Sequence, residues 1–127
     1  VLCMISNDRI KTADSIKKVE KPWGYEVWWA ENQSYAAKFI HINPESRMSL
    51  QYHKKKRETL YVMRGALYVW EDPSGDDDPI ILNPGAVYHV EPGQVHRFGA
   101  GKVGVMVCEV STPELDDVVR LQDDYKR

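Results

Sequence analysis

Four polar residues in two short stretches have the types and the spacing to bind a metal ion. Gln51 and His53 are two positions apart in a predicted strand, so both side chains leave the same face. Glu58 follows a basic turn at the head of the next predicted strand, and His96 opens a third strand after a Pro-Gly turn. One amide, two imidazoles and one carboxylate at strand ends predict a metal site with an open coordination position. This mixed donor set suits one divalent metal. Zinc, manganese, iron, cobalt and nickel all fit, so the donor types do not identify the metal.

We assign no chemical role to two other sequence patterns. His41 and His89 are single histidines in predicted strands, without the spacing of a ligand set. Residues 99–104 match G-x-G-x-x-G, but a dinucleotide site requires a helix after this motif, inside a βαβ unit. Because a strand pattern follows here, we interpret these glycines as a hairpin turn.

The elements that must position the four candidate ligands are short strands. Segments rich in aromatic and β-branched residues, such as residues 25–30, 35–42 and 103–110, alternate with turns that contain Gly, Pro or Asn. Roughly ten strands are expected, and no connection between them is long enough for a βαβ unit. The pattern predicts an all-β barrel or jelly roll.

Length and composition predict a single domain. The chain has 127 residues, of which 43% are hydrophobic and 28% are charged, as is usual for a globular protein. We assign residues 1–20 to an N-terminal arm, with a candidate helical turn at 15–19, and residues 21–127 to the β domain. A net charge of -2 argues against general binding to nucleic acid or membranes. No apolar run could span a bilayer and no signal peptide is recognisable, so we expect a cytoplasmic protein.

The strand that carries Gln51 and His53 also has an apolar face. Met48, Leu50 and Tyr52 alternate with the polar residues and point to the opposite side. If the polar face lines the barrel interior around a metal, the apolar face must be covered by the N-terminal strand or by a second subunit. This argument predicts a homodimer.

The ligand spacing resembles the paired motifs of the cupin superfamily, which here are Gln51-x-His53-x4-Glu58-x6-Gly65 and Gly93-x2-His96. More narrowly, the chain resembles the type II mannose-6-phosphate isomerase (phosphomannose isomerase) family, whose domain often follows a mannose-1-phosphate guanylyltransferase. The supporting segments are residues 21–24 (KPWG), 48–53, 92–97 and 116–127. The resemblance implies a cupin-type double-stranded β-helix, which is a jelly-roll barrel, in a stand-alone form of the isomerase domain.

The resemblance also implies a function. The family interconverts mannose 6-phosphate and fructose 6-phosphate through an enediol, and a divalent metal that holds two sugar oxygens stabilises the developing charge. In this sequence Arg127, from the terminal motif, is the main candidate for phosphate binding, with Arg97 and Lys56 as helpers. Arg127 and Lys55 are the catalytic candidates. The base stays open: Glu58 could serve if it is not a ligand, and Lys55 would need a lowered pKa.

The surroundings of the ligands depart from the family pattern. Lys55 and Thr59 stand where the family has histidine, and Ala100 stands where it has asparagine. The complete ligand set favours the isomerase, whereas the altered surroundings favour a non-catalytic cupin that binds a sugar or a sugar nucleotide. A third hypothesis is another metal-dependent cupin enzyme, such as an iron-dependent oxygenase, because one fold hosts many functions.

Overall fold

The computed structural model describes residues 9–126, and this part contains eleven β-strands and no α-helix. The predicted all-β fold is therefore confirmed. In chain order the strands are β1 (Lys17–Lys21), β2 (Gly24–Glu31), β3 (Ala36–Ile42), β4 (Leu50–His53), β5 (Glu58–Arg64), β6 (Leu67–Trp70), β7 (Ile80–Leu82), β8 (Val87–Val90), β9 (Arg97–Gly99), β10 (Val105–Ser111) and β11 (Val118–Gln122). Residues 9–126 contain no helix that is long and apolar enough to cross a membrane.

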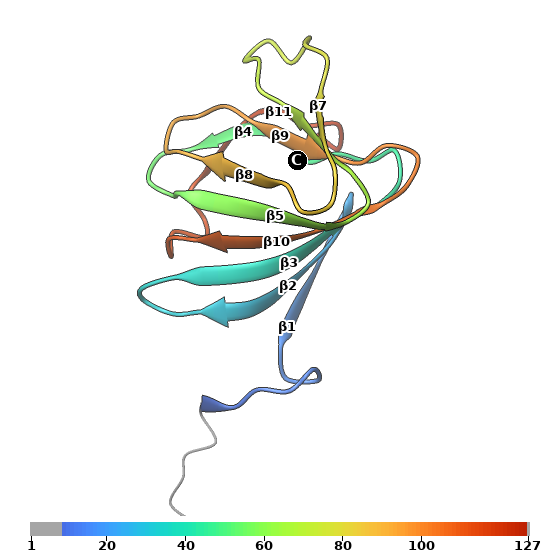
Figure 1. Ribbon diagram of the computed structural model, residues 1–127. Helices are drawn as coiled ribbons and strands as arrows, with labels where there is room; N and C mark the ends of the chain where they lie inside the picture. Colours follow the sequence, from blue (N-terminus) through green and yellow to red (C-terminus); the bar gives the residue numbers. More distant parts are fainter. Residues whose placement is uncertain (1–8, 127) are drawn as a thin grey trace, which may run out of the picture.

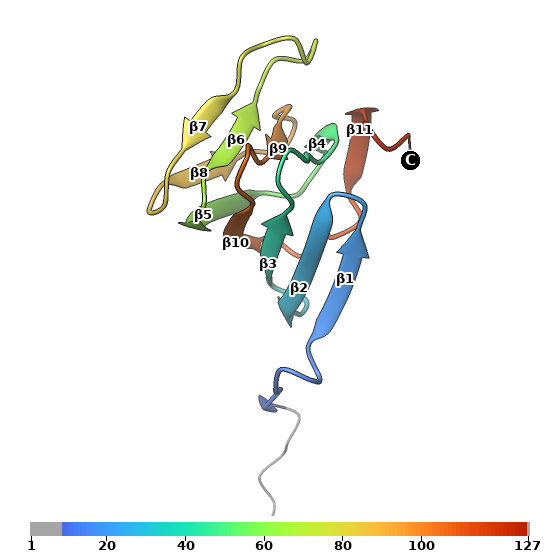
Figure 2. The same ribbon diagram turned by 90° about the vertical axis from the view of Figure 1, so that its right-hand side faces the viewer.

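The strands form two facing layers (Figures 1 and 2). The larger layer is one antiparallel sheet in the order β1-β2-β3-β10-β5-β8. The second layer joins the pair β11-β4 to the sheet β7-β6-β9 through a bridge between Gln51 and His96, whose backbone N–H groups each donate to the other's carbonyl at 2.9 Å. This bridge places two of the predicted ligands directly opposite each other.

The hydrophobic core fills one end of the space between the layers. Alternation along each strand sends every second residue inward, as in β5, where Leu60 and Val62 are buried while Tyr61 and Met63 are exposed. The largest side chain in the core is Trp23, which is 1% exposed. Its cluster includes residues from both layers, which are Ile40, Ile42, Leu60, Val62, Leu67, Val69, Val90, Phe98, Val105 and Val107.

The N-terminal part of the sheet begins earlier than expected. Residues 17–21 form β1, which pairs with β2 from Lys17 opposite Trp28 to Lys21 opposite Gly24. The helical turn predicted over residues 15–19 is therefore wrong, because the backbone of this segment hydrogen-bonds to β2. The Lys17 ammonium also lies 4.1 Å from the centre of the Trp28 ring.

Two expected turns are crossings between the layers. The glycine-rich segment 99–104 is followed by a strand, as predicted, but it is no hairpin, because β9 pairs with β6 while β10 pairs with β3 and β5. Likewise, the basic turn after β4 leads to β5 in the opposite layer, and β4 pairs with β11 instead. These crossings bring residues that are close in sequence to facing walls of the barrel.

The apolar face of β4 gives little support for a second subunit, because Leu50 is already fully buried within the single chain. Exposed apolar side chains gather instead on the outer face of the large sheet, where Tyr61, Met63 and Val110 are each close to half exposed. The homodimer stays a prediction, and this outer face is where a second copy would find apolar surface.

Candidate metal centre

The structure brings the four sequence-predicted ligands together. Gln51 and His53 lie on β4, Glu58 is the first residue of β5, and His96 directly precedes β9. Ligand atoms of His53, Glu58 and His96 all lie within 4.8 Å of one another, and Gln51 Nε2 is 3.4 Å from His53 Nε2. All four residues are buried. Two layers of the barrel therefore contribute to one compact group of nitrogen and oxygen donors.

Backbone carbonyls orient both imidazole rings toward this group. His53 Nδ1 lies 2.9 Å from the Asp117 carbonyl oxygen, and His96 Nδ1 lies 3.0 Å from the Gln94 carbonyl oxygen. A carbonyl only accepts, so each Nδ1 carries a hydrogen, and the other ring nitrogen, Nε2, is the atom available to a ligand. His96 Nε2 is buried and has no hydrogen-bond partner among residues 9–126. Such an orphaned nitrogen fits a metal ligand.

Glu58 supplies negative charge between the histidines. Its Oε2 is 3.2 Å from His53 Nε2 and 3.2 Å from Lys56 Nζ. Burial raises the pKa of Glu58, but the hydrogen bond with His53 and the charge of Lys56 together lower it to about 2. Burial also lowers the pKa of His96, so its imidazole is neutral at neutral pH. An ionised carboxylate facing imidazole nitrogens fits a divalent cation.

Gln51 meets the centre through its amide. Ser49 Oγ donates to Gln51 Oε1, so in this orientation the amide nitrogen faces His53. Coordination through the amide oxygen requires a flip, after which the Ser49 hydroxyl can accept from Nε2. Gln51 can therefore serve as a ligand without moving its backbone.

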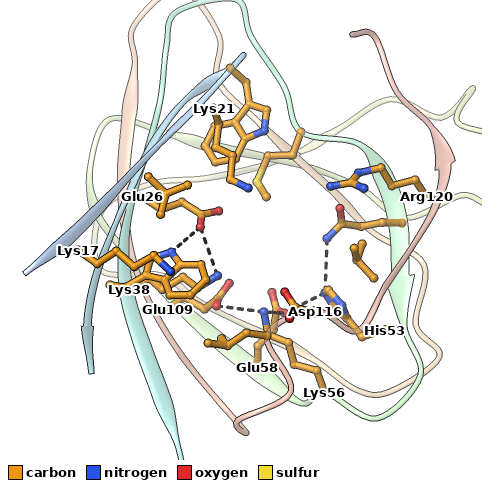
Figure 3. Close-up of a pocket in the computed structure, with 17 residues that line it drawn as sticks. Lys17, Lys21, Glu26, Lys38, His53, Lys56, Glu58, Glu109, Asp116 and Arg120 are labelled. Carbon is orange, nitrogen blue, oxygen red and sulfur yellow. Dashed lines mark hydrogen bonds and ion pairs between the residues drawn. The ribbon is translucent and has the colours of Figure 1, made fainter. Parts of the chain in front are cut away.

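The centre opens into a pocket of about 410 Å³ between the layers (Figure 3). Besides the contact between Lys56 and Glu58, its wall carries two further buried ion pairs, Lys38 with Glu26 at 3.3 Å and Lys56 with Glu109 at 3.2 Å. Burial lowers the pKa of Lys56, but the neighbouring carboxylates outweigh this and raise it. Lys56 therefore remains charged inside the pocket.

The predicted substrate-binding cations are only partly brought to this pocket. Lys56 lines it, but its ammonium is engaged by two carboxylates. Arg97 is buried away from it, where Nε donates to the Met48 carbonyl at 3.0 Å, because adjacent residues of a strand point to opposite sides. Lys55 is exposed and does not line the pocket, and Arg127 lies outside the described residues.

One structural residue of the centre was missed in the sequence. The Asp117 carboxylate accepts hydrogen bonds from the backbone N–H groups of Lys55 at 2.6 Å and Lys56 at 2.9 Å, while its carbonyl orients His53. Asp117 thereby connects β11 to the basic turn and to a ligand. The sequence did contain a signal for the importance of Asp117, because residues 116–120 belong to a segment that supports the family resemblance.

The fold and this donor group define a cupin with a candidate metal centre. Residues 7–123 match the family described as mannose-6-phosphate isomerase C-terminal, and the chain belongs to this family. It is 29% identical over 115 residues to the xanthan biosynthesis protein XanB of Xanthomonas campestris pv. campestris (strain B100), covering 87% of this chain and 24% of that protein. It is 30% identical over 118 residues to the mannose-1-phosphate guanylyltransferase of Escherichia coli (strain K12), covering 87% and 23%. The chain thus spans about a quarter of the length of these curated relatives.

Solved structures show the same fold at low sequence identity. KdgF from Halomonas sp. superposes with a TM-score of 0.69 at 18% identity, covering 84% of this chain and 95% of that chain. A protein described as a sugar phosphate isomerase from a cupin superfamily, from Silicibacter pomeroyi, superposes with a TM-score of 0.64 at 19% identity, covering 80% and 73%. These likenesses establish the double-stranded β-helix.

Proposed function

We propose that this chain is a metal-dependent sugar-phosphate isomerase that interconverts mannose 6-phosphate and fructose 6-phosphate. The observation that carries the proposal is the convergence of two imidazole nitrogens, from His53 and His96, and the Glu58 carboxylate within 4.8 Å, beside an open pocket that His53 and Glu58 line. The family to which the chain belongs supplies the substrate pair.

The chemistry requires a proton to move between adjacent carbons. His53, His96 and Glu58, with the Gln51 amide, would hold the divalent metal, which supplies Lewis-acid stabilisation of the negative charge on the sugar oxygens. The proton leaves C2 as the enediol forms and is returned to C1, while a hydroxyl proton passes from O2 to O1. No oxidant or reductant is needed.

Glu109 is the pocket residue that we assign to the proton transfer. Its side chain is buried in the wall beside the Lys56 ammonium, 3.2 Å away. Burial raises the pKa of Glu109, and the nearby Glu58 charge adds to this effect. A raised pKa makes the carboxylate a stronger base at neutral pH, as proton abstraction from carbon requires.

A coupled assay of mannose 6-phosphate conversion tests the proposal. Chelated protein is re-supplied with zinc, manganese, iron, cobalt or nickel, and metal content is measured in parallel. We expect His53→Ala to lose both metal and turnover. Glu109→Gln should keep the metal and lose kcat by about a hundredfold or more. The matched control is His89→Ala, at an exposed histidine of β8, which should behave like the parent. A parent protein that binds a metal yet shows no turnover with any of the five would refute the isomerase.

A second candidate is a non-catalytic module that binds a sugar or a sugar nucleotide. The observation in its favour is that the Lys56 ammonium already contacts the Glu58 carboxylate at 3.2 Å, so a cation of the chain competes with a metal for this ligand. Binding of sugar phosphate without turnover, with or without metal, is the result that would select this function.

A further inference from the structure

We propose that Lys21 and Arg120 form an anion-binding subsite at the mouth of the pocket, which takes the phosphate of the substrate. The identity of the ligand as a sugar phosphate rests on the proposed function, whereas the affinity for a phosphate group follows from the two cations alone. Neither residue is among the phosphate-binding candidates from the sequence.

Strands from opposite ends of the chain bring the two cations to one pocket. Lys21 ends β1 and Arg120 lies in β11, and both line the pocket that contains His53 and Glu58. Figure 3 shows both side chains on the side of the pocket away from Lys56. A ligand could therefore contact the cations with one end and the metal centre with the other.

Lys21 and Arg120 differ from the other cations of the wall because, among residues 9–126, neither a carboxylate nor an aromatic ring engages them. Lys38 pairs with Glu26, and Lys56 pairs with Glu58 and Glu109, as described above. Lys17 lies over the Trp28 ring. By contrast, among residues 9–126 no carboxylate lies within ion-pair distance of Lys21 or Arg120.

One acidic residue of the pocket wall also has no ion-pair partner among residues 9–126. The Asp116 side chain is exposed and makes no ion pair with the lysines or arginine of the wall. In Figure 3 it lies on the side of the pocket near His53, away from Lys21. Positive charge therefore dominates the side where Lys21 and Arg120 lie, and an anion is the complementary ligand.

The turn that carries Lys21 is held firmly. Only Pro22 and Trp23 separate β1 from β2, and Trp23 is buried in the core while its carbonyl accepts a hydrogen bond from the Asn43 N–H at 2.9 Å. At Gly24 a Cβ atom would lie 1.9 Å from the His41 carbonyl oxygen, so only glycine allows this close approach. The KPWG segment thus has a structural role that positions its lysine.

The register of β11 positions Arg120. Arg120 lies opposite Gln51 and Val118 lies opposite His53 in the antiparallel pair β11-β4. Because alternate residues share a face, Val118 and Arg120 both turn toward the pocket. The guanidinium is therefore adjacent to the predicted ligand Gln51, close enough for one small ligand to reach both.

A phosphate monoester on a sugar is the ligand class that fits. Guanidinium groups bind phosphate oxygens with two parallel hydrogen bonds, and an ammonium adds a compact charge from another direction. The diphosphate of a nucleoside diphosphate sugar carries the same chemistry. The experiment separates these two sources.

Calorimetric titration of the metal-loaded protein tests the subsite without requiring turnover. The variants are Lys21→Met and Arg120→Gln, and the matched controls are Lys102→Met and Arg64→Gln, at exposed positions outside the pocket. The probes are mannose 6-phosphate, mannose, inorganic phosphate and a nucleoside diphosphate mannose. Thermal unfolding verifies that each variant is folded.

We expect each subsite variant to weaken mannose 6-phosphate binding by about tenfold to a hundredfold. Binding of inorganic phosphate should weaken as well, while mannose binding and both controls stay unchanged. Equal phosphate binding by parent and variants, or no phosphate binding by the parent, would overturn the subsite. Phosphate binding that depends on Lys21 and Arg120 in a parent without turnover would uphold the subsite and refute only the isomerase. Preference for the diphosphate sugar would uphold the subsite and identify its occupant as a sugar nucleotide.

Discussion

The two ends of the barrel interior differ in character although the same strands line both. Along the inner face of β10, Val107 belongs to the apolar core and Glu109 belongs to the pocket. Along β5 the order is reversed, from Glu58 in the pocket to Leu60 in the core. Because β5 and β10 are antiparallel, their polar residues meet at one end and their apolar residues at the other.

The difference separates the end where the barrel gains stability from the end where its candidate functional groups lie. Burial of apolar side chains stabilises the core end by about 25 cal/mol for each Å² removed from water. At the pocket end, desolvation of Lys38, Lys56 and their carboxylate partners cancels much of the attraction between the charges. A buried charge cluster that adds little stability is consistent with the binding and catalysis that we propose for this end.

The largest expected effect is a loss of stability from a substitution at the apolar end of the barrel. Leu60→Ala should reduce the free energy of unfolding by about 2–5 kcal/mol, because it leaves a cavity at a fully buried position. The metal affinity of the folded fraction should stay within about twofold, since Leu60 is not a ligand. Urea unfolding and metal titration measure the two quantities. The control Leu121→Ala, at a leucine that is 45% exposed, should change stability by less than about 0.5 kcal/mol.

A smaller effect, dependent on pH, is expected at the charged end. The pKa of Glu58 is about 2 in the folded protein and 4.5 ordinarily, so its ionised form contributes stability above pH 4.5, which is lost as the pH falls toward 2. In metal-free protein, Glu58→Gln should therefore be less stable than the parent at pH 6, by about 2–3 kcal/mol. Urea unfolding across this range should show the two proteins converging as the pH falls. A gap that stays constant from pH 6 to pH 3 would contradict the ion-pair account of Glu58.

The smallest effect concerns the link between β11 and the centre. Asp117→Asn removes the charge that accepts the N–H groups of Lys55 and Lys56 but keeps the carbonyl that orients His53. Metal affinity should fall by about tenfold, as is common when a partner of the ligands is altered. Asp116→Asn, at the neighbouring exposed carboxylate, is the matched control and should leave metal affinity unchanged. Equal affinities for both variants would show that the Asp117 carboxylate does not support the centre.

Much of the candidate centre was predictable because its information is local. The two-residue period of a strand places Gln51 and His53 on one face, and the same period places Arg97 on the side opposite His96. This second consequence argues against phosphate binding by Arg97 in the pocket. The residue types predicted a metal centre, and their motifs predicted the cupin fold.

The sequence by itself therefore determined the class of fold and the donor atoms of the centre, because strand periodicity and side-chain chemistry act over a few residues. Only the tertiary structure decided that β4 pairs with β11, that Lys56 pairs with Glu109, and that Lys21 and Arg120 share one pocket. These partners are separated by 53 or more positions in the chain. Contacts of that separation depend on the register of the sheets and on closure of the barrel, for which no short stretch of residues carries a signal.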